Sequence, residues 1–235
     1  MKNTDAKYGD DEKYEPWADI NIFFPIAEQL IDPLHNMGLS PNMVTIISTI
    51  FTFMSIYFLH IGERHYAMLS YISGYILDCV DGKMARKHKI TSDIGMALDS
   101  TSDVISNSAL VGYLLITREY TETNIYIFIA LGIMSFLLSL SYGLNEAIAS
   151  YEATGSDDFY KRRLDQLFKN NLEELPIYKC RLYNIFLSIQ KVSYRTYRYI
   201  FPEYNVDAID RWLSIIKHFG PGNYCAFVTI LLFFI

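Results

Sequence analysis

The chain has 235 residues, of which 51% are hydrophobic, and a formal net charge of −6. That length suits one domain or two small ones, and the absence of a basic face from the sequence excludes a nucleic-acid-binding protein. The mean hydropathy is only +0.13, because long apolar runs alternate with charged segments. Apolar runs of about 20 residues are typical of transmembrane helices, so the sequence predicts an all-α, polytopic membrane helix bundle. The three cysteines lie far apart and are expected to be free thiols.

The first 36 residues divide into two parts. Residues 1–16 are polar and acidic, and we expect a disordered, solvated tail without a cleavable signal peptide. Residues 17–36 carry apolar side chains at helical spacing, interrupted by Pro25 and Pro33, which indicates a bent amphipathic helix. A position in the membrane interface is the favoured interpretation, and an ordinary core helix is the alternative.

Residues 37–235 are expected to form one transmembrane domain. Ser40 and Pro41 mark its first helix, because Ser caps free amide groups and Pro suits the first helical position. Four apolar runs follow, at residues 43–61, 66–77, 97–117 and 124–145. Each run predicts a helix of the membrane bundle.

Lys and Arg in the connecting segments predict the orientation. Basic residues gather after the second and fourth apolar runs, whereas the opposite side offers only Arg64 and Arg118. Because cytoplasmic loops are enriched in Lys and Arg, both basic segments and the N-terminus are expected to face the cytoplasm. The basic residues of segment 83–89 have a second interpretation, which is the binding of substrate phosphates.

The C-terminal part is less regular. Residues 147–181 are predicted to form a charged cytoplasmic insertion that contains a helix at 157–170. Residues 181–201 carry an apolar stripe interrupted by basic residues, which indicates a helix in the bundle or on the membrane surface. The final apolar stretch, 224–235, is too short to cross a bilayer at about 1.5 Å per residue, so the chain is expected to stop inside a last span.

Acidic and small residues share one face where the second apolar run ends. Relative to Asp78 on a helix, Asp81 lies at about −60°, Gly82 at about +40° and Ala85 at about −20°. Two carboxylates are therefore bordered by two residues with little or no side chain. Such a patch leaves room for a flat group, such as a nucleobase, against the helix.

The next helix carries a second pair of carboxylates. Gly95, Asp99 and Asp103 fall within about 80° of one another. If the two helices pack antiparallel, four carboxylates converge at their cytoplasmic ends. Burying like charges together is costly, and coordination of Mg²⁺ or Mn²⁺ by oxygen ligands relieves that cost. Two such ions would clamp a diphosphate and leave one carboxylate free as a base.

Other interpretations of these acids remain open. A single intramembrane Asp can cap a helix or pair with a cation such as Lys83 or Arg86, although four Asp in two in-phase pairs favour a metal site. Intramembrane carboxylates also mark cation pathways, but a carrier should place acids at several depths, whereas these gather at one end. An inactive membrane scaffold predicts that Asp103→Asn changes nothing measurable.

The pattern resembles the signature of the CDP-alcohol phosphotransferases, also called phosphatidyltransferases. The positions that match are Asp78, Asp81, Gly82, Ala85, Arg86, Gly95, Asp99 and Asp103. The resemblance extends over residues 17–145, includes the Pro41-Asn42-x-x-Thr45 entry to the first apolar run, and fades after Glu146.

The resemblance implies about six transmembrane helices, a homodimer and a site with two Mg²⁺ or Mn²⁺ ions that opens toward the cytoplasm. Its implied metal ligands are Asp78, Asp81 and Asp99, together with Asp103, which is also the implied general base. Gly82 and Ala85 would border the cytidine, and Arg86 would hold that pocket or its phosphates. Asn42 and Thr45 are further implied neighbours of the nucleotide.

The activity implied by the resemblance is transfer of a phosphatidyl group from CDP-diacylglycerol to a small alcohol, with release of CMP. A CDP-choline or CDP-ethanolamine phosphotransferase that acts on diacylglycerol is the alternative, because the aspartate signature reads only the shared CDP-diphosphate. That branch often carries a His after the third Asp of the signature, where this chain has Ser100. The acceptor alcohol is left open, because its pocket would be lined by later helices that match least.

Overall fold

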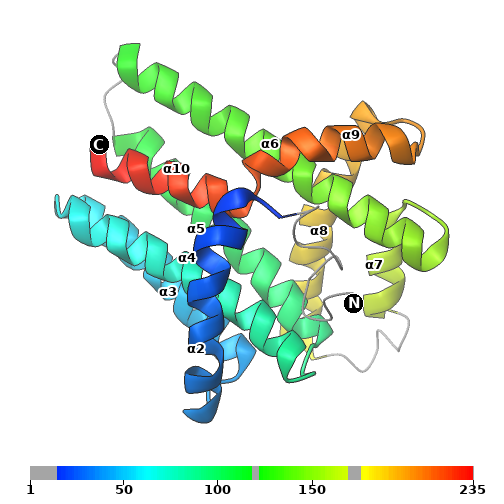
Figure 1. Ribbon diagram of the computed structural model, residues 1–235, viewed down its shortest axis with the longest axis horizontal. Helices are drawn as coiled ribbons and strands as arrows, with labels where there is room; N and C mark the ends of the chain where they lie inside the picture. Colours follow the sequence, from blue (N-terminus) through cyan, green and yellow to red (C-terminus); the bar gives the residue numbers. More distant parts are fainter. Residues whose placement is uncertain (1–14, 118–121, 169–175, 235) are drawn as a thin grey trace.

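The computed structural model describes residues 15–117, 122–168 and 176–234, and every regular element within these ranges is helical (Figure 1). The elements are η1 Asp19–Phe23, α2 Phe24–Asn36, α3 Pro41–His60, α4 Arg64–Lys87, α5 Asp93–Thr117, α6 Glu122–Thr154, α7 Phe159–Phe168, α8 Ile177–Ile200, α9 Val206–Ile216, η3 Lys217–Phe219 and α10 Pro221–Phe234. The all-α prediction is therefore confirmed. The tail expected at 1–16 lies almost entirely outside the described residues.

The predicted amphipathic segment is one helical unit with a change of register. Its first turn, η1, is π-helical, and the N–H of Phe24 donates to the carbonyl of Asp19. Pro25 follows directly and has no N–H to donate, which explains why the ordinary α-helical hydrogen bond is missing at this point. Pro33 lies inside α2 without ending it.

The first long helix begins where the sequence predicts. Ser40 caps α3 by accepting a hydrogen bond from the N–H of Met43 at 3.3 Å, and Pro41 is the first helical residue. Among the described residues, two helices are long and apolar enough to cross a membrane, judged by length and composition. They are Pro41–His60 and Ile125–Thr154. The six spans implied by the resemblance stay a prediction.

Helix α3 supports both helices that carry the aspartates. It packs against α4 and α5, whereas α4 and α5 are not closely packed on each other. Gly74 permits the close approach of α3 and α4, because a Cβ atom at this position would lie 3.0 Å from the carbonyl oxygen of Ser48. Helices α2 and α10 also pack on α4. The sequence predicts that the two aspartate-bearing helices, α4 and α5, pack directly on each other. In the structure, α3 packs against both and holds them together.

The C-terminal half is more helical than the sequence indicates. Residues 147–154, expected to begin the cytoplasmic insertion, continue α6 to Thr154. Helix α7 confirms the helix predicted at 157–170, of which 169 and 170 lie outside the described residues. Helix α8 belongs to the bundle, since it packs against α5, α6 and α7. Its buried side includes Tyr183, Phe186, Leu187, Gln190, Ser193 and Tyr197.

Candidate metal and nucleotide site

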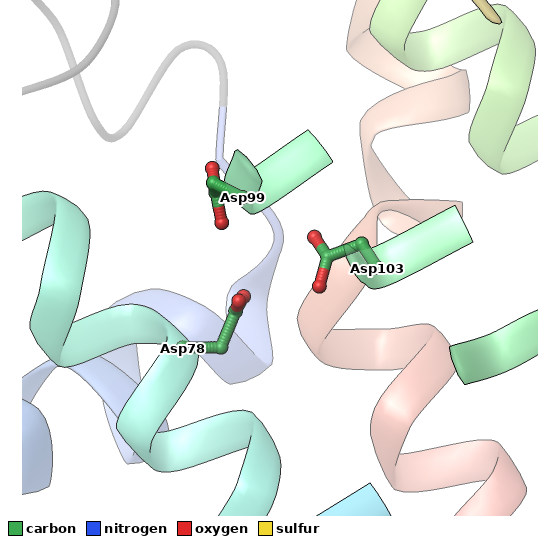
Figure 2. Close-up of side chains that lie close together, drawn as sticks. All are labelled: Asp78, Asp99 and Asp103. Atoms are coloured by element: carbon green, nitrogen blue, oxygen red, sulfur yellow. The ribbon is translucent and has the colours of Figure 1, made fainter. Parts of the chain in front are cut away.

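Three carboxylates from two helices meet at one point. Asp78 lies near the end of α4, and Asp99 and Asp103 lie one turn apart on α5. One oxygen atom from each of the three lies within 4.8 Å of the others, and the side chains point toward one another (Figure 2). All three residues are half-buried. The convergence predicted from helical spacing is therefore present for these three residues.

Asp81, the fourth aspartate of the signature, is held beside the group of three. Its Oδ2 accepts a hydrogen bond from the hydroxyl of Thr45 at 2.5 Å, and its side chain is 4% exposed. It still lies within electrostatic reach of Asp99 and Asp103. Thr45, expected near the nucleotide, thus contacts a candidate metal ligand directly.

The donor set of this cluster fits a hard divalent cation. Mg²⁺ and Mn²⁺ prefer oxygen ligands at about 2.1 Å, so two ligands on opposite sides of one ion lie about 4.2 Å apart. Oxygen atoms within 4.8 Å of one another are close to that arrangement. In addition, Oδ1 of Asp78 is buried and has no hydrogen-bond partner among the described residues. Buried polar atoms are nearly always satisfied, and a cation would satisfy this one.

Residues expected to border the nucleotide lie next to the carboxylates. The guanidinium group of Arg86 lies over Gly82, where a Cβ atom would be 3.2 Å from Nη1. Gly95 is equally confined, because a Cβ atom there would lie 2.8 Å from the side-chain oxygen of Asn42. The two glycines therefore allow the side chains of Arg86 and Asn42 to approach the helix backbone closely. Ala85 is half-buried on the same helix as Gly82.

A hydrogen-bonded bridge joins α4 and α5 on the side of the carboxylates away from the α4–α5 loop. The hydroxyl of Tyr71 donates to Oδ1 of Asn107 at 2.9 Å, and Nδ2 of Asn107 donates to the carbonyl of Asp103. Tyr71 precedes Asp78 by seven residues, and Asn107 follows Asp103 by four, so each lies on the carboxylate side of its helix. Sequence analysis did not find this bridge, since neither residue belongs to the signature.

Two basic residues of segment 83–89, Lys83 and Lys87, form ion pairs with acids of α2. Lys83 Nζ lies 3.1 Å from a Glu28 carboxylate oxygen and 4.1 Å from the centroid of the Phe24 ring, and its side chain is 8% exposed. Lys87 Nζ lies 2.7 Å from Asp32. Both pairs join α4 to α2. The signal was present in the sequence, because two acids and two lysines are each spaced by four residues.

Asp19 is a buried carboxylate outside the signature. It is 1% exposed, accepts a hydrogen bond from the Tyr75 hydroxyl at 2.7 Å and accepts another from the N–H of Gly222 at 2.9 Å. Burial raises the pKa of Asp19 from 3.8 to about 7, and the Tyr75 hydrogen bond partly opposes that rise. Asp19 therefore joins the start of η1 to α4 and to the N-terminus of α10.

Comparison with known proteins places these residues in one family. The family model for the CDP-alcohol phosphatidyltransferases matches residues 38–155, just over half of the chain. That range contains α3, α4 and α5 and every residue singled out for the metal and nucleotide site. The chain belongs to the CDP-alcohol phosphatidyltransferase family.

Three curated relatives match shorter parts of the chain. It is 31% identical over 88 residues to an uncharacterized protein of Aquifex aeolicus, covering 36% of this chain and 45% of that one. It is 31% identical over 84 residues to the archaetidylinositol phosphate synthase of Pyrococcus horikoshii, with the same two shares. It is 26% identical over 141 residues to the CDP-diacylglycerol–inositol 3-phosphatidyltransferase of Saccharomyces cerevisiae, covering 57% of this chain and 63% of that one.

The matched part of the chain spans about half the length of the first two relatives and less than two thirds of the third. No solved structure matches the chain.

Proposed function

We propose that this protein transfers a phosphatidyl group from CDP-diacylglycerol to a small alcohol and releases CMP, with two Mg²⁺ or Mn²⁺ ions as cofactors. The observation that carries the proposal is the meeting of Asp78, Asp99 and Asp103 within 4.8 Å, inside the family-matched range. A cluster of carboxylates with a buried, unsatisfied oxygen calls for a cation, and a diphosphate is the substrate group that such cations bind.

The choice of donor rests on the relatives and on one residue. The yeast relative is named as an enzyme that uses CDP-diacylglycerol. Ser100 follows the third aspartate of the signature, where the aminoalcohol branch often has His. Both observations favour CDP-diacylglycerol over CDP-choline or CDP-ethanolamine. The nucleotide portion of the donor would be the same in either case.

Asp103 is the proposed general base. An acceptor hydroxyl attacks the phosphorus atom of the phosphatidyl group, and its proton passes to the Asp103 carboxylate. The new bond joins phosphorus to the acceptor oxygen, and the bond to the bridging diphosphate oxygen breaks, so CMP leaves. Asp78, Asp81 and Asp99 would hold the ions, and the ions supply positive charge that neutralises the diphosphate. Thr45 fixes the position of the Asp81 carboxylate beside this group through its hydrogen bond.

The cytidine is proposed to lie against the small residues of α4. Gly82 and Ala85 share a face with Asp78, and the Arg86 guanidinium lies beside Gly82 within reach of phosphate oxygens. Asn42 approaches Gly95 from the start of α3, so it borders the same end of the site. A bulkier side chain at Gly82 would displace both the guanidinium and the base.

The proposed setting is a membrane, with the protein as a homodimer crossing it several times. The two helices with the length and composition of spans, Pro41–His60 and Ile125–Thr154, support this setting. The concentration of Lys and Arg at the end of α4 and in α7 supports a cytoplasmic position for the carboxylates and the N-terminus.

The proposal is tested by measuring CMP release from purified protein in lipid nanodiscs. CDP-diacylglycerol, CDP-choline and CDP-ethanolamine are each combined with inositol, inositol phosphate, glycerol phosphate, serine or diacylglycerol in the presence of Mn²⁺. We expect CMP from CDP-diacylglycerol with one alcohol of this panel, and none after chelation of the metal. Absence of CMP from every pairing would favour the inactive scaffold, and CMP from CDP-choline with diacylglycerol would favour the alternative donor.

A further inference from the structure

Helices α4 and α5 carry the candidate metal ligands, yet they are not closely packed on each other. The carboxylates of Asp78, Asp99 and Asp103 nevertheless point toward one another from the two helices, with an oxygen atom of each within 4.8 Å of the others (Figure 2). Ionised carboxylates at this distance repel one another when no cation is bound. The separation of the two helices therefore needs support from the rest of the chain, beyond the packing of α3 on both.

The carboxylates lie between two direct connections of α4 to α5. One is the loop of residues 88–92, which joins the C-terminus of α4 to the N-terminus of α5. The other is the hydrogen bond from the Tyr71 hydroxyl to Oδ1 of Asn107, which is 2.9 Å long. At about 1.5 Å per residue, Tyr71 lies about 10 Å before Asp78 along the axis of α4. By the same measure, Asn107 lies about 6 Å beyond Asp103 along α5. The loop and the hydrogen bond thus restrain the helices on opposite sides of the candidate metal site.

The orientation of the Asn107 amide group follows from its two contacts. Its Nδ2 donates to the backbone carbonyl of Asp103 at 2.9 Å, and a carbonyl can only accept. The amide oxygen is therefore directed to Tyr71, whose hydroxyl is the donor. The Tyr71–Asn107 bridge thus connects α4 to the backbone of the residue that is the proposed base.

The Tyr71 side chain is held in place by apolar packing. It is 4% exposed and belongs to the same buried cluster as Leu110 and Leu114 of α5. Its hydroxyl lies within electrostatic reach of Asp78 and Asp103. A Phe side chain would pack in this cluster equally well, and it would not need a partner for a buried hydroxyl. What the hydroxyl adds is the connection between α4 and α5.

We propose that Tyr71 and Asn107 are positioning residues, which hold the carboxylates of α4 and α5 at the separation that a divalent cation requires. The inference rests on the proposed function and adds to its site two residues that are not themselves metal ligands. Preorganised ligands bind an ion more tightly, because less of the binding free energy is spent on bringing like charges together. Loss of the bridge should therefore weaken the metal site without removing any of its ligands.

The test is Mn²⁺ binding to the purified protein in nanodiscs, without donor or acceptor, followed by electron paramagnetic resonance of the unbound ion. Tyr71→Phe removes the hydroxyl and keeps the ring, and we expect Mn²⁺ to bind about tenfold more weakly than to the wild type. Tyr75→Phe is the matched control, because it makes the same change one turn along α4, where the hydroxyl donates to Asp19 at 2.7 Å. It should bind Mn²⁺ as tightly as the wild type.

A double-mutant cycle shows whether the two residues act through one hydrogen bond. Asn107→Leu should weaken Mn²⁺ binding by a similar factor, and combining it with Tyr71→Phe should weaken binding no further, because either change breaks the same contact. Two independent structural defects would instead multiply their effects on the affinity. Thermal unfolding is the check on folding, and Asn107→Leu tests the inference by itself if Tyr71→Phe does not fold.

Turnover supplies a second measurement that general damage to the fold would not reproduce. Tyr71→Phe should need about tenfold more Mn²⁺ for half-maximal CMP release and should approach the wild-type rate when Mn²⁺ is saturating. A misfolded or loosened protein would keep a low rate at every Mn²⁺ concentration.

The outcomes separate the two proposals. If no CDP donor yields CMP while Tyr71→Phe still weakens Mn²⁺ binding, the proposed function fails and the positioning role stands. If CMP is released while Tyr71→Phe binds Mn²⁺ as tightly as the wild type, the function stands and the inference is overturned. An equal loss of affinity in Tyr75→Phe, or no Mn²⁺ binding by the wild type, would also overturn it.

Discussion

The carboxylates that join helices differ from those of the candidate metal site in what surrounds them. Glu28 and Glu146 each face a Lys or Arg of another helix at 3.0–3.1 Å. Asp78 instead faces other aspartates, and its buried Oδ1 has no hydrogen-bond partner in the part of the chain that the structure describes. The chain supplies the counter-charge for the first group. For the second group we propose that a metal ion supplies the counter-charge, and this difference would separate the acids that join helices from the candidate metal ligands.

The largest effect that this comparison predicts is at Asp103. Asp103→Asn keeps the shape of the side chain but removes the proposed base, and we expect turnover to fall by about 10³-fold, within the usual range for general-base catalysis. Steady-state CMP release measures it, with thermal unfolding as the check on folding. Asp207→Asn, an exposed position on α9, is the matched control and should keep full activity. Normal turnover by Asp103→Asn would exclude Asp103 as the base.

Asp19 is a third kind of buried carboxylate. It has neither an ion-pair partner among the described residues nor a place in the candidate metal site, and its protonation changes with pH. Its pKa is 3.8 when unfolded and about 7 when folded, so its contribution to stability is complete below pH 3.8 and is lost as the pH rises toward 7. The loss is on the order of 4 kcal/mol, at about 1.4 kcal/mol per pKa unit. Glu15 and Lys83 are its charged neighbours, with opposite effects on this pKa.

The pH effect is measured as the unfolding midpoint between pH 4 and pH 8. We expect a decline for the wild type and a flatter profile for Asp19→Asn, because Asn carries no charge and can accept from the Gly222 N–H through Oδ1 while donating to the Tyr75 hydroxyl through Nδ2. Parallel profiles for the two proteins would show that Asp19 titrates in the same range folded and unfolded.

Thr45 tests whether the position of Asp81 matters for turnover. Thr45→Val keeps the volume of the side chain and removes the hydrogen bond to Asp81, a charge-assisted bond worth about 1.5 kcal/mol or more. We expect turnover to fall about tenfold with the fold retained. Thr49→Val is the control, since the Thr49 hydroxyl donates only to a carbonyl of its own helix. Equal losses in the two variants would assign the effect to helix α3 rather than to Asp81.

The smallest effects belong to the acids of α2. Glu28→Gln replaces the ion pair of the nearly buried Lys83 with a neutral hydrogen bond, and should lower the free energy of unfolding by about 1 kcal/mol. Asp32→Asn breaks an exposed pair and should change stability by no measurable amount. Denaturant titration measures both. A loss of turnover in either variant would place this segment in the catalytic machinery.

More of the candidate site than of the rest of the fold could be predicted from the sequence, because the spacing of the aspartates along each helix is a local feature. The phases of Asp78 and of the pair on α5 follow from the 3.6-residue period alone. The setting of Asp81 could not be predicted in the same way, because its Thr45 partner lies 36 residues away on another helix. The Glu146–Arg163 contact likewise depends on how α6 continues beyond its apolar part.

The fold shows the same limit. Apolar runs predicted α3 and α5 well, since hydrophobic length is read directly from the sequence. Residues 147–154 read as a charged connection because their helix continues past the apolar run, where hydropathy gives no signal. Helix α8 was ambiguous for a related reason. Its apolar stripe faces α5 and α6, whereas Lys191 and Arg195 on its other faces lower the mean hydropathy.

Direct titration with Mn²⁺, followed by electron paramagnetic resonance of the unbound ion, tests the central claim that the aspartates of α4 and α5 form a divalent metal site. We predict up to two Mn²⁺ bound per chain in the wild type and an affinity at least about tenfold weaker in Asp78→Asn, with Asp207→Asn unchanged. Equal Mn²⁺ binding by the wild type and Asp78→Asn, or no binding by either, would contradict the account.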